Sequence, residues 1–299
     1  MRDWLRLVRA PLAPTAACDA VACALLARGP GAGAGPAAGA ADLLLLAATS
    51  VLVYAAGMAG NDLADRRRDV VLHPERPLPS GRVPVAAAAV LVAALAAGAV
   101  ALGGGPAGSR VAVVVAVVLA AAYDGGAKRA LVPGALAMGG VRAANAATGV
   151  LPLVLAGTAP AWTLLAPACV GLYSAGITVL STAEDRPERA SARRHVASAT
   201  TALAFAGAAV LALAAGAGPV FGAFFAGAVV LSATFRRVPR AKAPVGAQVL
   251  EMLLGFYWLD AVLATGGAEG SAWALALAAF GGAFALILGS QLAVRALRR

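Results

Sequence analysis

Residues 40–60 read AADLLLLAATSVLVYAAGMAG and contain a single charged side chain, that of Asp42. A helix of about 20 apolar residues crosses the roughly 30 Å hydrocarbon layer of a membrane, so this stretch predicts a transmembrane helix. Similar runs recur along the 299 residues, of which 61% are hydrophobic and 13% charged, with a mean hydropathy of +0.83. A soluble core does not need so much apolar surface. The sequence therefore predicts an all-α, polytopic transmembrane helical bundle in a lipid bilayer.

Apolar runs separated by breaks predict ten membrane helices within one domain, residues 1–299. We expect these helices near 12–28, 40–63, 84–103, 109–123, 133–154, 160–183, 195–216, 218–236, 243–265 and 271–294. Nine helices is the alternative, and we prefer ten because nine would place the C-terminal arginines on the opposite side of the membrane from the other basic loops. The many Gly and Ala residues within the runs allow close helix packing.

Basic residues alternate from loop to loop. Of the 24 Lys and Arg residues, 21 lie at the two termini and in every second loop, whereas the connectors between those loops contain none. The positive-inside rule places the basic loops in the cytoplasm, which predicts a multi-pass protein of the cell membrane. The net charge of +10 is spread over these loops and is not gathered on one face or tail, so we expect no nucleic-acid partner.

The charged stretch NDLADRRRD, residues 61–69, follows the first quoted run directly. On a helix, Asp62, Asp65 and Asp69 lie at positions i, i+3 and i+7, within about 60° of one another, and Asn61 joins the same side. At about 6 Å and an effective dielectric near 20, each pair of carboxylates repels by on the order of 3 kcal/mol. We therefore expect a cation here, and ligands with oxygen donors only suit Mg²⁺.

Arginines follow the acidic residues, and Arg76 and Arg82 lie in the segment PERPLPSGR, residues 74–82. Guanidinium groups bind phosphate oxygens through two parallel hydrogen bonds. A divalent metal with arginines beside it predicts a phosphate-containing ligand. The alternative is a charged, solvated loop that flanks a membrane helix.

The residues Asn61, Asp62, Asp65 and Asp69 resemble the NDxxDxxxD motif of the UbiA superfamily of intramembrane prenyltransferases, and residues 76–81, RPLPSG, resemble the RPxPSG segment that follows it. This resemblance implies a bundle, usually of nine helices, around a central cavity open to lipid. It also implies two acidic motifs that hold Mg²⁺ and a prenyl diphosphate, and an acceptor that becomes prenylated.

The second acidic motif of that family is usually DxxxD, and the corresponding segment here is residues 178–194, TVLSTAEDRPERASARR. Glu184 and Glu188 keep the four-residue spacing, which predicts metal binding by both and a substrate contact by Glu188. Pro187 disfavours a regular helix at this point. The alternative is a mixed-charge loop held by local Glu and Arg pairs.

The segment 123–129, YDGGAKR, resembles the family's Tyr-x-x-x-Lys-Arg loop with one additional residue. The resemblance implies that Lys128 and Arg129 contact the diphosphate and neutralise the leaving group. Tyr123 is a candidate for substrate binding, as a cavity aromatic whose π face could stabilise a carbocation. Topogenic lysines are common in such loops, and an aromatic side chain at the membrane interface is the alternative for Tyr123.

Arg142 and Asn145 lie one turn apart in the apolar segment 138–149, MGGVRAANAATG. An arginine near the middle of a membrane helix costs about 2.5 to 3.5 kcal/mol, so we expect Arg142 to face the cavity or a buried acid such as Asp19, Glu251 or Asp260. The pattern MGxxRxxN resembles the EboC-like and related actinobacterial branch of the superfamily. Both side chains are candidates for substrate binding.

Together these features predict Mg²⁺-dependent transfer of a prenyl group from a prenyl diphosphate to an unidentified acceptor, which could be an aromatic quinone precursor or another small nucleophile. Asp62, Asp65, Lys128 and Arg129 are the expected catalytic residues. An intramembrane terpene cyclase, or a protein that binds or transports lipid diphosphates without catalysis, could use the same first motif.

Overall fold

The computed structural model describes residues 1–32, 39–103, 107–184, 187–217 and 244–267. Two of the expected helices, 218–236 and 271–294, lie outside these residues, and so does the distinction between nine and ten helices. The described elements are α1 Arg2–Leu7, η1 Ala10–Leu12, α2 Ala13–Leu26, η2 Pro30–Ala32, α3 Ala40–Leu72, α4 Val85–Leu102, α5 Ala107–Gly125, η3 Ala127–Arg129, α6 Leu131–Ala147, α7 Leu151–Leu155, η4 Ala161–Leu164, α8 Leu165–Ser181, η5 Pro187–Arg189, α9 Ala190–Ala214 and α11 Val245–Ala264.

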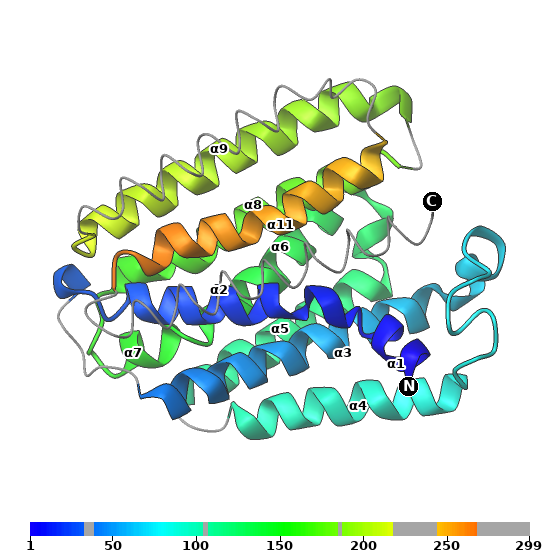
Figure 1. The fold of residues 1–299 in the computed structure, drawn as a ribbon, viewed down its shortest axis with the longest axis horizontal. Coiled ribbons are helices and arrows are strands. Elements are labelled where there is room, and N and C mark those ends of the chain that lie inside the picture. The colour runs from blue at the N-terminus through cyan, green and yellow to red at the C-terminus, as the bar shows by residue number, and fades with distance from the viewer. Residues whose placement is uncertain (33–38, 104–106, 185–186, 218–243, 268–299) are drawn as a thin grey trace.

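The long helices lie side by side along the longest dimension of the molecule (Figure 1). Among the described residues, five helical segments are long and apolar enough to cross a membrane, and the apolar segment Ala10–Leu26 is shorter. The predicted all-α transmembrane bundle is confirmed.

Helix α3 is longer than expected, and its length positions the acidic motif. It runs for 33 residues to Leu72, about 50 Å at 1.5 Å per residue, which exceeds the thickness of a hydrocarbon layer. The motif at 61–69 is therefore helical, as its spacing predicted, and lies on turns that extend toward one end of the bundle.

The prediction of one helix over 133–154 is wrong. Helix α6 ends at Ala147 and a separate short helix, α7, begins at Leu151. Pro152 lies in the first turn of α7, where its missing N–H is tolerated, whereas inside one continuous helix its ring would clash with the preceding turn. In addition, the backbone N–H and the hydroxyl of Thr148 both donate to the carbonyl of Asn145, at 3.2 and 2.7 Å, in the last turn of α6.

Small residues bring α6 and α8 together. A Cβ atom added to Gly139 would lie 2.7 Å from the carbonyl oxygen of Gly171, and the reverse substitution would give the same distance. This contact is the close backbone approach that small residues permit between membrane helices. It fixes α6, which carries Arg142 and Asn145, against α8.

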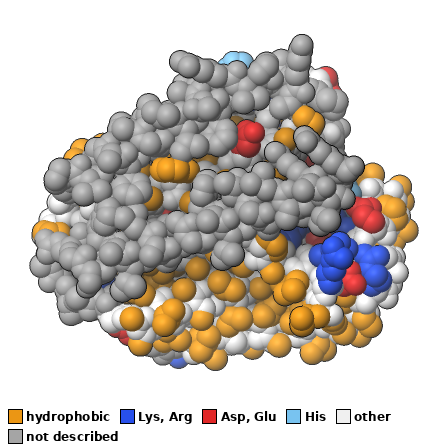
Figure 2. All heavy atoms as spheres, viewed as in Figure 1, with side chains coloured by type: hydrophobic (Ala, Val, Ile, Leu, Met, Phe, Trp, Pro, Cys, Tyr) orange, Lys and Arg blue, Asp and Glu red, His pale blue; other side chains and the backbone are white. Residues whose placement is uncertain are grey.

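The charged side chains gather at one end of the bundle. Figure 2 shows Lys, Arg, Asp and Glu side chains together at the end where α1 and the last turns of α3 lie, while hydrophobic side chains cover the surface over α3 and α4. Helix α1, which the sequence did not predict, packs there through the fully buried Leu7 against Ala59, Leu78 and Val83. This packing holds the N-terminus beside the acidic motif.

Candidate active site

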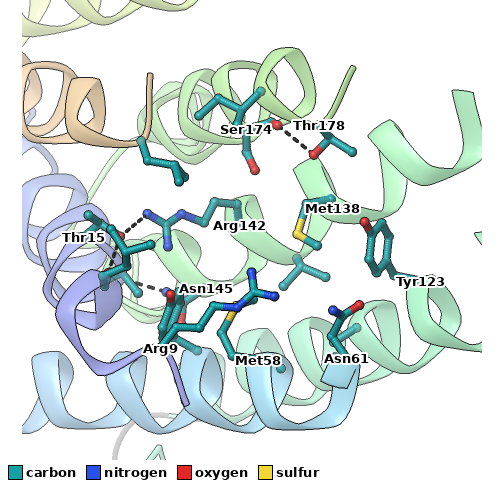
Figure 3. A pocket seen from close by; sticks show the side chains of 18 of the residues that line it. Arg9, Thr15, Met58, Asn61, Tyr123, Met138, Arg142, Asn145, Ser174 and Thr178 are labelled. Carbon is teal, nitrogen blue, oxygen red and sulfur yellow. Dashed lines mark hydrogen bonds between the residues drawn. The ribbon is translucent and has the colours of Figure 1, made fainter. Parts of the chain in front are cut away.

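A cavity of about 240 Å³ lies between α2, α3, α5, α6, α8 and α11. Figure 3 shows Asn61 and Tyr123 at one end of it and Thr15 at the other, with Met58 and Met138 between them. Its lining is mainly apolar, with polar groups at both ends and along the α8 side. We call the end with Asn61 and Tyr123 the mouth and the end with Thr15 the inner end.

Acidic and basic side chains form a cluster at the mouth, and Asp62 and Asp69 contribute two buried carboxylates. The Nη1 atom of Arg76 lies 2.7 Å from Asp69 Oδ2 and 3.6 Å from Asp62 Oδ1. The Nη2 atom of Arg9 lies 3.4 Å from the same oxygen of Asp62. Arg76 therefore bridges two acids of the motif, and Arg9 reaches one of them from the turn between α1 and η1.

Lys128 forms the second half of this mouth cluster. Its Nζ atom lies 2.8 Å from Asp65 Oδ2, 2.9 Å from Asn61 Oδ1 and 3.2 Å from Asp124 Oδ1. The same atom lies 5.7 Å from the centroid of the Tyr123 ring. The repulsion that the sequence predicted among the three motif aspartates is thus balanced by cations of the protein itself.

Arg142 lines the inner end of the cavity and is paired with a buried acid. Its Nε atom lies 2.7 Å from Asp19 Oδ2, its Nη2 atom donates to the hydroxyl of Thr15 at 2.9 Å, and its guanidinium carbon lies 4.1 Å from the Phe256 ring centroid. Asp19 and Asp260 are completely buried. The expectation that Arg142 faces a cavity or a buried acid is confirmed in both respects.

Asn145 lies close to Arg142 and has a fixed orientation. The hydroxyl of Ser50 donates to the carbonyl of Ala16 at 2.6 Å, so its oxygen accepts from Asn145 Nδ2, also at 2.6 Å. This leaves Asn145 Oδ1 buried without a hydrogen-bond partner. Asn145 therefore ties α6 to α3 and α2 and has one acceptor unused.

The donor set at the mouth fits Mg²⁺. Asn61, Asp62 and Asp65 offer hard oxygen ligands from α3, and Mg²⁺ is usually held by one or two carboxylates together with substrate phosphates and water. Within the described part of the chain, no three His, Cys, Asp or Glu side chains form a ready-made metal site. These side chains therefore fit a metal ion whose remaining ligands come from a bound phosphate group and water.

Four predicted site residues lie apart from the mouth cluster. Arg82 is bound to Asp3 of α1, with 3.0 Å between Nε and Oδ1, and Arg129 is exposed. Glu184 is also exposed, and 68% of the Glu188 side chain is exposed, 4.0 Å from Arg189. None of these four side chains lines the cavity. The metal-binding role of Glu184 and Glu188 stays a prediction.

The sequence reasoning missed two residues of the cluster, Arg9 and Asp124. Arg9 looked like one of several basic residues before a membrane helix, yet its backbone has a φ of 47°, which is uncommon for a residue other than glycine. Asp124 directly follows Tyr123 in the quoted segment YDGGAKR. An acid beside a motif that binds anions was the available signal for Asp124.

The fold and the site together define a polytopic membrane protein with an internal cavity that ends in a cluster of acidic and basic side chains. The sequence profile of the UbiA prenyltransferase family matches residues 20–242, which is most of the chain. The chain therefore belongs to the UbiA prenyltransferase family and is a membrane-embedded prenyltransferase.

Solved structures of other proteins share this fold. A UbiA homologue from Aeropyrum pernix K1 is 25% identical, with a TM-score of 0.59 over 84% of this chain and 96% of the homologue. A structure of digeranylgeranylglyceryl phosphate synthase is 16% identical, with a TM-score of 0.59 over 89% and 98% of the two chains. A UbiA homologue from Archaeoglobus fulgidus, bound to DMAPP and Mg²⁺, is 15% identical, with a TM-score of 0.54 over 87% and 99%. The comparison with curated proteins gave no match.

Proposed function

We propose that this protein transfers a prenyl group from a prenyl diphosphate to an acceptor within the membrane, with Mg²⁺ as cofactor. The observation that carries the proposal is the mouth cluster, in which three cations and four aspartates lie together beside one end of a mainly apolar cavity, with Arg9 and Asp124 in its lining. A diphosphate needs cations and a metal, and a prenyl tail needs an apolar channel. The Archaeoglobus fulgidus homologues bound to DMAPP or GPP with Mg²⁺ support this choice of ligand.

Arg76, Lys128 and Arg9 would bind the diphosphate oxygens. Each cation lies within 4 Å of a motif carboxylate, so each can exchange that carboxylate for a phosphate oxygen by a small movement of its side chain. Exposed Arg129 would add positive charge from the same loop as Lys128. Donors that are held in place before the reaction stabilise the charge that develops on the leaving diphosphate.

Asp62 and Asp65 would hold Mg²⁺, with Asp69 holding Arg76 in position or binding a second ion. When bound, the metal would neutralise charge on the diphosphate as the carbon–oxygen bond breaks. Glu184 and Glu188 are proposed to contribute from the loop after α8. The active-site loops would face the cytoplasm of a cell membrane, because the basic loops lie on that side by the positive-inside rule.

The cavity would hold the prenyl group and keep water from the allylic cation. Tyr123, Met58 and Met138 line the part next to the mouth, and the face of an aromatic ring attracts a cation. The acceptor would enter beside the prenyl group, within reach of the polar inner end formed by Arg142 and Asn145.

The test is release of diphosphate by detergent-purified protein with Mg²⁺ and C10 to C20 prenyl diphosphates, with and without candidate acceptors. Asp65→Ala should lower turnover by on the order of 100-fold or more, whereas Asp42→Ala, the same change at the opposite end of α3, should leave turnover near that of the unchanged protein. Turnover that requires an acceptor supports prenyl transfer. Release with a cyclic hydrocarbon, binding without release, or full activity of Asp65→Ala would contradict the proposal.

A further inference from the structure

The ammonium group of Lys128 has no free donor. A lysine ammonium carries three N–H groups, and three oxygens lie within hydrogen-bond distance of Nζ: those of Asp65 at 2.8 Å, Asn61 at 2.9 Å and Asp124 at 3.2 Å. The side chain is only 15% exposed. In this arrangement Lys128 fills a small oxygen-lined site with a positive charge.

The three oxygens that surround Nζ belong to residues of two different helices. Asn61 and Asp65 are on α3, whereas Asp124 is in the last turn of α5. Lys128 follows in η3, after a turn at Gly126. The backbone φ of Gly126 is 155°, which lies in the region that favours glycine. Asp124 lies against α3, because a Cβ atom added to Gly60 would be 3.6 Å from its Oδ2 atom. Asp124 can therefore keep hold of Lys128 even if the α3 oxygens turn to another cation.

A divalent metal and Lys128 compete for the same α3 oxygens. Mg²⁺ binds oxygen ligands at about 2.0–2.1 Å, and two cations cannot use the same oxygens of Asn61 and Asp65 at these distances without strong repulsion. The ammonium must move before a metal can bind there. A diphosphate provides new acceptors for the ammonium and, in addition, phosphate ligands for the metal.

We propose that Lys128 is a tethered competitor for Mg²⁺, which makes metal binding depend on the diphosphate, and that Asp124 is the positioning residue that retains the displaced ammonium at the mouth. The inference rests on the proposed function, because it assigns the order of binding at that same site. Mg²⁺ alone binds weakly, since it must displace Lys128 without compensation. Thermodynamic reciprocity requires that the metal also strengthens diphosphate binding by the same factor.

Lys128 is better suited to this role than the two arginines of the cluster. Arg9 and Arg76 lie 3.4 and 3.6 Å from Asp62, and their side chains are 40% and 29% exposed. Their contacts with Asp62 are longer and more open to water, so they compete less with a metal. Lys128 has shorter contacts with two α3 oxygens and is held from α5 as well.

The experiment measures binding of Mn²⁺, as a paramagnetic substitute for Mg²⁺, to the full-length purified protein by electron paramagnetic resonance. Titrations are run with the metal alone and with inorganic pyrophosphate. In Lys128→Met, the affinity for the metal alone should rise by on the order of 10-fold, and the gain from pyrophosphate should shrink. Lys128→Gln, which can still donate a hydrogen bond to Asp124, tests the same loss of charge if the methionine variant does not fold.

Two further variants separate this inference from a general charge effect. Arg67→Met removes one positive charge from an exposed position two residues from Asp65 and should change the metal affinity less than about twofold. Asp124→Asn should leave binding of the metal alone nearly unchanged but weaken pyrophosphate binding in the presence of metal, and Asp124→Glu should restore part of it.

The outcomes distinguish the inference from the proposed function. Metal affinity in Lys128→Met and Lys128→Gln that equals that of the unchanged protein, or an equal gain in Arg67→Met, would overturn the inference while leaving the proposed function intact. Failure of the unchanged protein to bind pyrophosphate with metal would overturn the proposed function and the inference with it.

Discussion

Ion pairs lie at both ends of the cavity, and the side chains that form them differ in their exposure to solvent. At the inner end, Asp19 is fully buried and only 10% of the Arg142 side chain is exposed, with 2.7 Å between the charged atoms. At the mouth, the Asp62 and Asp69 side chains are also buried, but 29% of the Arg76 side chain and 40% of the Arg9 side chain reach solvent. Arg9 and Arg76 can therefore leave their partners for solvent, whereas Arg142 has no solvated position to move to. Lys128, with 15% of its side chain exposed, lies between these two cases.

This difference in solvent exposure indicates that the inner ion pair has a structural role, whereas the mouth cluster is suited to binding a ligand. Removal of one partner of a buried pair leaves an uncompensated charge and costs about 3–5 kcal/mol. Ion pairs that water can reach are usually worth about 0–1 kcal/mol, so their partners can be exchanged for a ligand at little cost. We infer that the inner pair holds α2 and α6 together, and that the mouth cluster is organised to bind and release an anion.

The largest expected effect is on stability, for the variant Arg142→Met. It leaves Asp19 and Asp260 buried without a cation that interacts with both of them, and we expect a loss of about 3–5 kcal/mol in the free energy of unfolding. Thermal unfolding in detergent, followed by size-exclusion chromatography, measures this loss. The double variant Asp19→Asn, Arg142→Met should recover part of it. If the thermal unfolding midpoint of Arg142→Met equals that of the unchanged protein, the inner ion pair does not stabilise the fold as we infer.

Arg76→Met should have a small effect on stability and a large effect on pyrophosphate binding. We expect a loss of stability of about 1 kcal/mol, because the guanidinium is partly solvated, but a loss of pyrophosphate affinity of roughly 10- to 100-fold, the value of a charge-assisted hydrogen bond of about 1.5–3 kcal/mol. Calorimetric titration with pyrophosphate and Mg²⁺ measures the affinity. Arg82→Met, in the same loop but bound to Asp3, is the matched control. An equal loss in both variants would show that only the total charge of the loop matters.

Local periodicity explains what the sequence predicted well. The spacing of Asp62, Asp65 and Asp69 depends only on helix geometry, and the structure continues α3 through all three residues. The apolar run over 133–154 was misjudged because hydropathy does not reveal where a helix ends, although Pro152 was a visible signal. Membership of the prenyltransferase family, inferred from the same motif, is confirmed.

Contacts between distant segments explain what the sequence did not predict. Arg9 and Asp62 are 53 positions apart, and their approach depends on how α1 packs against α3. The sequence left open whether Arg142 pairs with a buried acid or binds substrate, and it offered Asp19, Glu251 and Asp260 equally as acids in the apolar runs. Only the packing of α2, α6 and α11 brings Arg142 together with Asp19 and Asp260. Asp124 was overlooked because the family motif places no acid there.

The smallest expected effect concerns Glu188, and it tests where the mouth cluster ends. Because 68% of its side chain is exposed and its contact with Arg189 is as long as 4.0 Å, Glu188→Gln should change stability by less than about 0.5 kcal/mol. If Glu188 contributes a metal ligand only when a diphosphate is bound, the variant should require more Mg²⁺ for half-maximal turnover while metal binding without diphosphate stays unchanged. Arg189→Gln, the other half of the same exposed pair, should not alter the Mg²⁺ requirement. A Mg²⁺ requirement that is the same in Glu188→Gln and in the unchanged protein would remove Glu188 from the site and confine the metal to the oxygens of α3, where Lys128 already lies.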